Sequence, residues 1–334
     1  MKKIVVVGIT GLVVIVLVVL GAWYYLSSKP VYSGTPESIT IGGSSSEYSG
    51  LIYIAEDQGF FTRNGLNVTM IDYNSGPSSI NGLLNGDVDV WLAPEFTVVG
   101  NVFDNENISI IGCIDKYQSV YLIARKNDGI ENISDLNGKA IGVTLGGQRE
   151  FYLGRFLDLN GMSISNVTLV NMPSSQYVQA ITNGSVDAVI TDQNIDQIKD
   201  QLGDNAVLWS AQSSQDGYYV MACLNAWTAS HPGQIDRLLK SLDQAEQYAI
   251  DHPAEAEAIV QEKLNYSDEQ MAETWPENQF SITLDQSLLT AMNDEGQWMI
   301  YNNLTSENTT PDYQDYIYTK GMEEVKPQAV NIND

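Results

Sequence analysis

Arg149 and three carboxylates are the side chains best suited to hold a small charged molecule, because each lies in a loop between a predicted strand and a predicted helix. The chain has only 16 Lys and Arg against 42 Asp and Glu, so an arginine in such a loop stands out. A guanidinium can hold a sulfonate or carboxylate through two parallel hydrogen bonds, although a salt bridge to Glu150 or Asp192 is the plainer alternative. Glu47, Glu95 and Asp192 could instead hold an amine or a planar cation. These residues are therefore compatible with an anionic ligand and with a cationic one.

The histidines and cysteines offer little for catalysis. His231 and His252 are the only histidines, and each precedes a proline that opens a predicted helix. Cys113 and Cys223 lie in apolar runs, which predicts two buried free thiols, with one disulfide as the alternative. Because no nucleophile stands beside a general base and no metal-ligand spacing occurs, we expect a binding protein, not an enzyme, with no metal and no cofactor.

Composition limits the possible partners. The net charge is −26, which argues against nucleic acid and against docking on an anionic membrane surface, since both need clustered Lys and Arg. A hydrophobic content of 43% is that of a globular chain. The length of 334 residues predicts about two domains.

The N-terminus predicts a membrane anchor. Residues 4–26 contain no charged side chain and would span about 34 Å as a helix, which is enough to cross a bilayer. Lys2 and Lys3 precede this run and should remain in the cytoplasm, which places the rest of the chain outside. We expect residues 1–26 to be a single-pass anchor in the cell membrane and residues 27–37 a linker. A cleaved signal peptide is the alternative.

Eight Asn-x-Ser/Thr motifs predict an exported, glycosylated surface, with asparagine-rich turns as the alternative. Composition alone would give about three or four such motifs. Together with the acidity and the anchor they favour an archaeal-like cell surface. The asparagines are Asn67, Asn107, Asn132, Asn166, Asn183, Asn265, Asn303 and Asn308.

Strand and helix patterns alternate from residue 38 onward, which is typical of an α/β fold with parallel sheets. Residues 79–90 and 177–188 share one pattern, a helix that stops at Asn-Gly and is followed by Val-Asp and an apolar strand. This repetition predicts two similar lobes, with a single large sheet as the alternative. After a strand at 219–224 the pattern is helical, at 232–250, 253–263, 267–275, 284–302 and 313–321. We therefore expect lobe one at residues 38–125 plus 219–330 and lobe two at 126–218, joined by two chain crossings that form a hinge.

Several segments resemble one family in chain order. They are residues 55–61, 64–68, 75–77, 85–89, 133–139, 230–232 and 251–255. They resemble the periplasmic solute-binding proteins of ABC importers, in the group for nitrate, aliphatic sulfonates, taurine and thiamine-pyrimidine precursors. The resemblance implies a two-lobed clamshell of the type II periplasmic-binding fold, with a small-molecule ligand between the lobes and an ABC permease as partner. We expect a monomer. A ligand-sensing domain, or an enzyme of thiamine-pyrimidine or menaquinone synthesis on the same fold, are the alternatives.

The ligand should lie beyond the carboxyl ends of the strands, where helix N-termini favour acceptor or anionic groups. Tyr48 and Tyr218 could stack on a ring. Three carboxylates near the cleft favour an organic ligand that carries a hydrogen-bond donor, sulfonate/taurine-like or aminopyrimidine-like, over a simple oxyanion. The predicted ligand-binding residues are Ser45, Ser46, Glu47, Tyr48, Gly76, Pro77, Ser78, Glu95, Gln118, Thr144, Gly146, Gly147, Gln148, Arg149, Asp192 and Tyr218.

Overall fold

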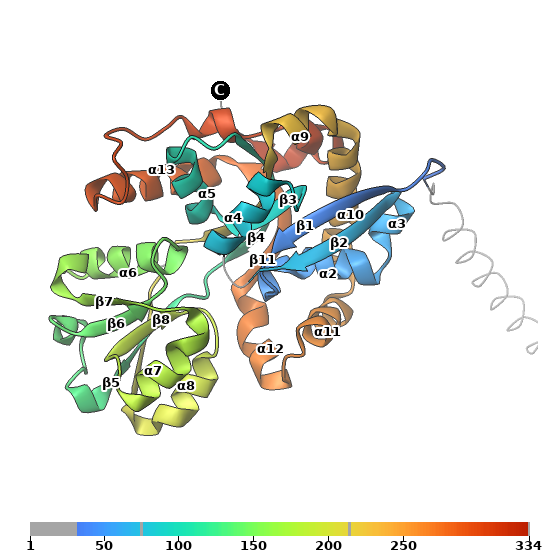
Figure 1. Ribbon diagram of the computed structural model, residues 1–334. Coiled ribbons are helices and arrows are strands. Elements are labelled where there is room, and N and C mark those ends of the chain that lie inside the picture. Colours follow the sequence, from blue (N-terminus) through green and yellow to red (C-terminus); the bar gives the residue numbers. More distant parts are fainter. Residues whose placement is uncertain (1–31, 74–75, 213–214, 333–334) are drawn as a thin grey trace, which may run out of the picture.

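The chain folds into two α/β lobes, each built on its own sheet (Figure 1). The structure is a computed structural model and describes residues 32–73, 76–212 and 215–332. The expected segment at residues 1–26 lies outside these ranges. Within them, no helix combines the length and the apolar character needed to span a bilayer.

The larger lobe has a seven-stranded sheet in the order β12-β11-β4-β10-β3-β1-β2. Its strands are β1 (Glu37–Gly43), β2 (Leu66–Asp72), β3 (Val90–Pro94), β4 (Ile108–Tyr117), β10 (Gly217–Leu224), β11 (Asn278–Asp285) and β12 (Val330–Asn331). Its helices are α2 (Gly50–Asp57), α3 (Phe60–Arg63), α4 (Gly76–Asn85), α5 (Glu95–Phe103), α9 (Asn225–Ser230), α10 (Pro232–Asp251), α11 (Pro253–Leu264), α12 (Asp268–Thr274), α13 (Gln286–Tyr301) and α14 (Lys320–Val325).

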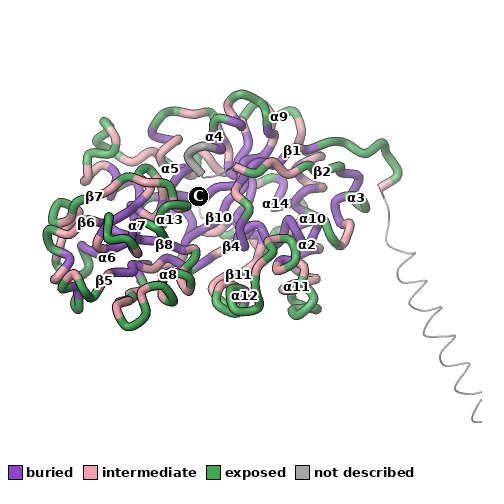
Figure 2. The backbone as a smooth tube through the Cα atoms, turned by 60° about the horizontal axis from the view of Figure 1, so that its bottom comes forward, coloured by how far each residue is buried: buried purple, intermediate pink, exposed green. Residues whose placement is uncertain are grey.

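The smaller lobe has a five-stranded sheet in the order β7-β6-β8-β5-β9. Its strands are β5 (Tyr121–Arg125), β6 (Ala140–Val143), β7 (Thr168–Asn171), β8 (Ala188–Thr191) and β9 (Ala206–Ser210). Its helices are α6 (Gln148–Leu159), α7 (Tyr177–Asn183) and α8 (Ile195–Leu202). The central strands of both sheets are buried on both faces and form the cores (Figure 2). The expected two-sheet fold is confirmed.

The repeated Asn-Gly and Val-Asp motif plays the same role in both lobes. Gly86 and Gly184 have φ of 78° and 79°, the left-handed conformation that glycine adopts without a steric penalty and that ends a helix. After this turn, an Oδ2 atom of Asp89 accepts the N–H of Thr40 at 2.8 Å in the first lobe. Asp187 Oδ2 accepts the N–H of Ala140 at the same distance in the second. The motif therefore ties a helix end to the start of the neighbouring parallel strand in each lobe.

Two expectations need correction. Tyr121–Arg125 forms β5 of the smaller sheet, so the first crossing lies at residues 118–120 and not after Arg125. The helical tail also contains strand β11, in which Ile282 and Leu284 are buried. Apolar and polar residues alternate only weakly in this segment. The strand forms because it pairs with β4. The helix expected from residue 284 starts at Gln286, because Asp285 caps it by accepting two backbone N–H groups.

Candidate functional site

Two hydrogen-bonded chain crossings join the lobes. The first lies at residues 118–120 and the second begins at Ala211. The N–H of Ala211 donates to the carbonyl of Val120 at 2.8 Å. Gln212 accepts the N–H of Val120 at 2.8 Å and donates to the carbonyl of Tyr117 at 3.0 Å. The crossings therefore form one narrow connection, the arrangement about which hinge closure occurs.

A cavity of about 210 Å³ lies between the lobes, at the carboxyl ends of strands from both sheets. We call it the inner cavity. The larger lobe contributes Ser44, Tyr48, Pro94, Thr97 and Tyr219 to its lining. The smaller lobe contributes Thr144, Gly147, Gln148, Arg149, Pro173, Ser174, Asp192 and Gln193. Most of these side chains are neutral hydrogen-bonding groups, and the two charged ones have opposite signs.

The two charges of the inner cavity neutralise each other. Arg149, in the first turn of α6, donates from Nε to Asp192 Oδ1 at 2.9 Å and also contacts that oxygen through Nη2. Burial alone would lower the pKa of Arg149, but the charge of Asp192 raises it above the ordinary value. The salt bridge that the sequence offered as an alternative is thus present, and it lies within the cavity.

Asp192 also links the lobes. Its Oδ2 accepts a hydrogen bond from Tyr48 of the opposite lobe at 2.9 Å and a long one from Gln148 at 3.5 Å. The Tyr48 hydroxyl lies 2.7 Å from Ser119 Oγ in the first crossing. One buried network therefore connects both lobes and the hinge.

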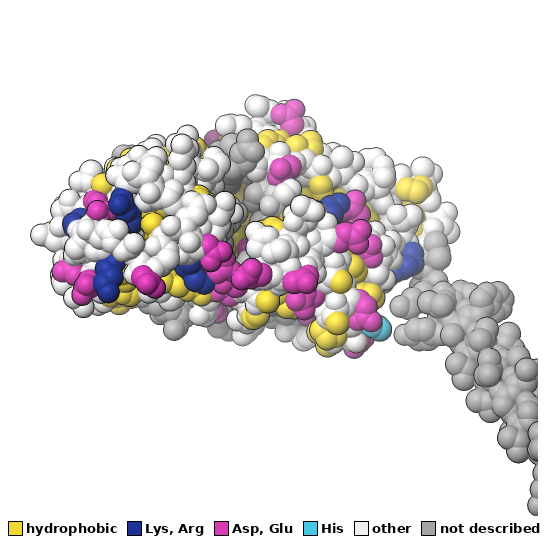
Figure 3. Space-filling model, turned by 90° about the horizontal axis from the view of Figure 1, so that it is seen from below, with side chains coloured by type: hydrophobic (Ala, Val, Ile, Leu, Met, Phe, Trp, Pro, Cys, Tyr) yellow, Lys and Arg dark blue, Asp and Glu magenta, His cyan; other side chains and the backbone are white. Residues whose placement is uncertain are grey.

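A second cavity of about 490 Å³ opens on the other side of Asp192, and we call it the acidic cavity. Among the residues that the structure describes, the charged ones in its lining are Glu47, Asp192, Asp196, Glu273, Glu277 and a single cation, Lys199. Lys199 is already paired, at 2.6 Å from Asp196 and 3.2 Å from Glu273. Acidic side chains also gather along the middle of the face shown in Figure 3.

Two carboxyl groups of the acidic cavity, Glu47 and Glu277, resist ionisation. Burial, reinforced by the charge of Asp192, raises the pKa of Glu47 to about 7. Burial also raises the pKa of Glu277. Each accepts a tyrosine hydroxyl, Glu47 from Tyr266 at 3.0 Å and Glu277 from Tyr121. A bound cation would favour the ionised form of both groups.

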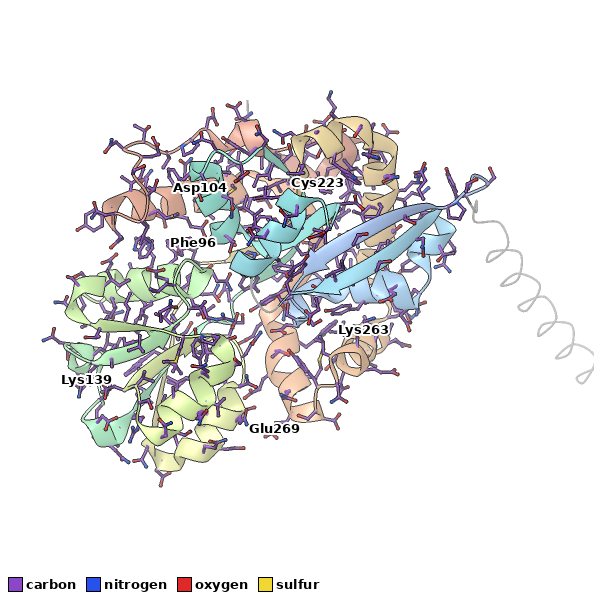
Figure 4. All side chains as sticks on the ribbon, viewed as in Figure 1. Phe96, Asp104, Lys139, Cys223, Lys263 and Glu269 are labelled. Atoms are coloured by element: carbon purple, nitrogen blue, oxygen red, sulfur yellow. The ribbon has the colours of Figure 1, made fainter. Side chains whose placement is uncertain are left out.

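Aromatic packing holds the lobes together beside the inner cavity. Phe96 of α5 stacks on Phe151 of α6 with ring centroids 5.4 Å apart, and Figure 4 shows Phe96 on the side of its lobe that faces the other. Trp298 of α13 meets Phe151 edge to face at 5.5 Å. The ring of Trp298 also lies over Gly154, where any Cβ would overlap it. The lobes are therefore in contact across α5, α6 and α13.

Glu95 lies behind this contact and lines neither cavity. It is 1% exposed and accepts the N–H of Tyr218 at 3.0 Å. Glu295 of α13 is fully buried and interacts with it. Burial raises the pKa of Glu95 to about 8, and burial together with the charge of Glu95 raises that of Glu295. The two carboxyl groups form a buried acidic pair at the lobe interface.

The structure brings together only part of the predicted site. Tyr48, Thr144, Gly147, Gln148, Arg149 and Asp192 line the inner cavity, and Ser45, Glu47 and again Asp192 line the acidic cavity. Ser46, Glu95, Gln118, Gly146 and Tyr218 line neither. Gly76, Pro77 and Ser78 form the first turn of α4, and their side chains lie outside the described part of the chain.

Two of these differences have simple physical causes. Tyr218 and Tyr219 are neighbours in β10 and point to opposite faces of the sheet. Tyr219 faces the inner cavity, whereas Tyr218 donates to Ser287 Oγ at 2.8 Å. Gln118 is in the first crossing, where its side chain donates to Asp216 at 2.6 Å. Neither side chain therefore faces the inner cavity.

Some residues that line the inner cavity were not predicted from the sequence. Pro173 and Ser174 follow strand β7, and the rule that ligands lie beyond strand carboxyl ends also covers that loop. Thr97 lies in the first turn of α5, two residues after Glu95. Only the strand alternation of β10 could have distinguished Tyr219 from Tyr218.

A sequence model described as NMT1/THI5 like matches residues 46–256, well over half of the chain. The chain belongs to the NMT1/THI5-like family. This confirms the group that the sequence motifs indicated.

Individual NMT1/THI5-like relatives are distant. The putative aliphatic sulfonates-binding protein of Bacillus subtilis is 24% identical over 213 residues, 61% of this chain and 64% of that protein. The 4-amino-5-hydroxymethyl-2-methylpyrimidine phosphate synthase of Aspergillus parasiticus is 22% identical over 231 residues, 63% of this chain and 65% of that protein. The match therefore spans less than two thirds of either relative.

Among solved structures, the alkanesulfonate-binding protein SsuA from Xanthomonas axonopodis pv. citri, bound to MOPS, superposes with a TM-score of 0.72. It is 14% identical and covers 86% of this chain and 99% of its own. At this identity the similarity shows the fold, which is that of periplasmic binding proteins.

Proposed function

We propose that the chain is an extracytoplasmic solute-binding protein that captures a small organic molecule between its lobes and delivers it to an ABC permease. The observation that carries the proposal is the inner cavity. It is polar, it lies at the strand ends of both lobes, and a two-crossing hinge joins its walls. The names of the relatives support a sulfonate/taurine-like or aminopyrimidine-like solute.

Closure of the lobes on the ligand is the proposed working motion. Tyr48 and Asp192 meet across the cleft, and the stacked pair Phe96 and Phe151 closes one side of it. Opening at the hinge would separate both contacts and admit solvent. A ligand that contacts both walls would favour the closed form, because only that form offers all of its partners at once.

The proposed setting is the outer face of a membrane. The uncharged run at residues 4–26 would anchor a monomer beside its permease and so raise its effective concentration there. All eight asparagines of the Asn-x-Ser/Thr motifs are exposed, which supports a glycosylated surface. None of them lines either cavity, so glycans would leave the cleft free.

Titration calorimetry tests the capture of a solute. The full chain, purified in detergent, is titrated with taurine, ethanesulfonate, nitrate and 4-aminopyrimidine. We expect binding of at least one organic compound, abolished in Ser174→Trp, which fills the inner cavity, and retained in Ser165→Trp, which lies on the exposed surface. Strong binding of nitrate alone would contradict the proposed ligand class. No binding of any compound would contradict the function.

Catalysis is the second candidate, because one relative is named a pyrimidine phosphate synthase. The described residues that line the two cavities include no histidine or cysteine, and we therefore favour capture. Mass spectrometry of the compound recovered after binding separates the two functions. A recovered compound with unchanged mass supports capture, and a changed mass supports catalysis. A ligand-sensing role would give the same binding result but no transfer to a permease.

A further inference from the structure

We propose that Asp192 is the specificity-determining residue of the cleft and selects a ligand that carries a protonated amine over one that carries only an oxyanion. The inference rests on the proposed function and assigns the chemistry of that site. Asp192 is 2% exposed and, like Gln193, lines both cavities. Its carboxylate therefore borders whatever occupies either space.

Arg149 is already paired with a buried carboxylate, which offsets its charge toward an oxyanion. Within the described part of the chain it is the only cation that lines the inner cavity, and both Nε and Nη2 already donate to Asp192. An oxyanion that took these donors would strip a buried carboxylate of its partner. Breaking a buried pair in this way is strongly unfavourable. An oxyanion that used the remaining N–H groups of Arg149 would still lie beside the carboxylate of Asp192.

An amine meets the opposite situation. At Asp192 Oδ2 the contact from Gln148 is long, at 3.5 Å, so a ligand amine could replace Gln148 as the second donor beside Tyr48. On its other side lie Glu47 and Glu277, whose partners are tyrosine hydroxyls and not cations. Lys199, the one cation in the described lining of the acidic cavity, is held by Asp196 and Glu273. A protonated amine would supply the missing positive charge.

The tyrosines of the acidic cavity favour the same chemistry. Tyr121 comes from the smaller lobe and Tyr266 from the larger, and both line the space between them. Each directs its hydroxyl at a carboxylate, and each lines the cavity, where a cation could lie against its ring. Both lobes therefore present carboxylates and aromatic rings to the ligand. Binding of an amine would for this reason also favour the closed form of the two lobes.

Calorimetry with a matched pair of ligands tests the inference. Taurine and ethanesulfonate differ only in the amine. In the wild type we expect taurine to bind about 10-fold to 100-fold more tightly, the range of one charge-assisted hydrogen bond. In Asp192→Asn, which keeps the shape and frees Arg149, we expect ethanesulfonate to gain at least about 10-fold and taurine to lose a similar factor. Asp158→Asn, at the exposed end of α6, should leave both affinities unchanged.

Each outcome is decisive. Equal wild-type affinities for the two ligands would overturn the inference while supporting solute capture, and this comparison needs no variant. Unchanged selectivity in folded Asp192→Asn, with circular dichroism as the check, would show that another residue makes the choice. If no compound of the panel binds to the wild type, both the inference and the proposed function fail. If Asp192→Asn does not fold, Asp192→Glu takes its place, and its displaced carboxylate should reduce the preference for taurine.

Discussion

The buried pair Glu95 and Glu295 makes stability depend on pH, and Glu95→Gln should remove much of that dependence. The variant keeps an oxygen that can accept the N–H of Tyr218. It also offers an amide donor to Glu295, which now has no hydrogen-bonded donor for either carboxyl oxygen within the described structure. The substitution therefore preserves shape and hydrogen bonding but removes one titrating group.

The magnitude follows from the two pKa values of Glu95. The unfolded value is about 4.3 and the folded value is about 8. Between them the folded chain holds a proton that the unfolded chain has lost, so stability falls as pH rises, by about 1.4 kcal/mol per pH unit. The contribution is fully present below about pH 4.3 and is lost by about pH 8. Between pH 5 and pH 7.5 this group lowers the free energy of unfolding by up to about 3 kcal/mol.

Urea unfolding monitored by tryptophan fluorescence measures the effect at pH 5, 6 and 7.5. Other buried carboxyl groups also titrate, so the quantity of interest is the difference between wild type and Glu95→Gln. It should be near zero at pH 5 and should favour the variant increasingly as pH rises. Glu262→Gln, at an exposed position of α11, is the control and should follow the wild type. Parallel profiles for wild type and Glu95→Gln would refute the reasoning.

Three further predictions concern the lobe interface and the thiols. Gly154→Leu places a side chain against the ring of Trp298, so the lobes should stay apart. Small-angle scattering should then give a larger radius of gyration than for the wild type. An unchanged radius would contradict the packing. Arg155→Ala removes a partly exposed ion pair across the same interface and should lower the unfolding free energy by less than about 1 kcal/mol in urea titrations; a larger loss would show a stronger role. Cys113 and Cys223 are free and buried, and burial raises the pKa of both. Neither should react with a thiol reagent until urea unfolds the chain, when both should; an absence of thiols after unfolding would indicate a disulfide.

Local patterns predicted the two-lobed architecture because both lobes repeat one short unit. The Asn-Gly stop and the Val-Asp pair act within a helix, a turn and the adjacent strand, so the sequence alone specifies their geometry. Strand β11 was missed because its partner β4 lies more than 160 residues earlier in the chain. Its weak alternation of buried and half-buried residues acquires meaning only once that neighbour is present.

The site was predictable at the level of loops but not of single side chains. The rule about strand ends placed Arg149 and Asp192 in the cleft, yet only tertiary structure decides whether a loop residue faces the cavity. Glu95 shows the limit clearly, since it opens α5 at a strand end and still turns into the core. Tyr218 and Tyr219 differ by one position, and the register of β10 decides between them.

A crystal structure of the chain grown with saturating taurine tests solute capture most directly. We expect taurine between the lobes, in contact with Tyr48 of one lobe and Asp192 of the other. The two lobes should be closed around it. Taurine bound on an outer surface, or closed lobes with no molecule between them, would contradict it.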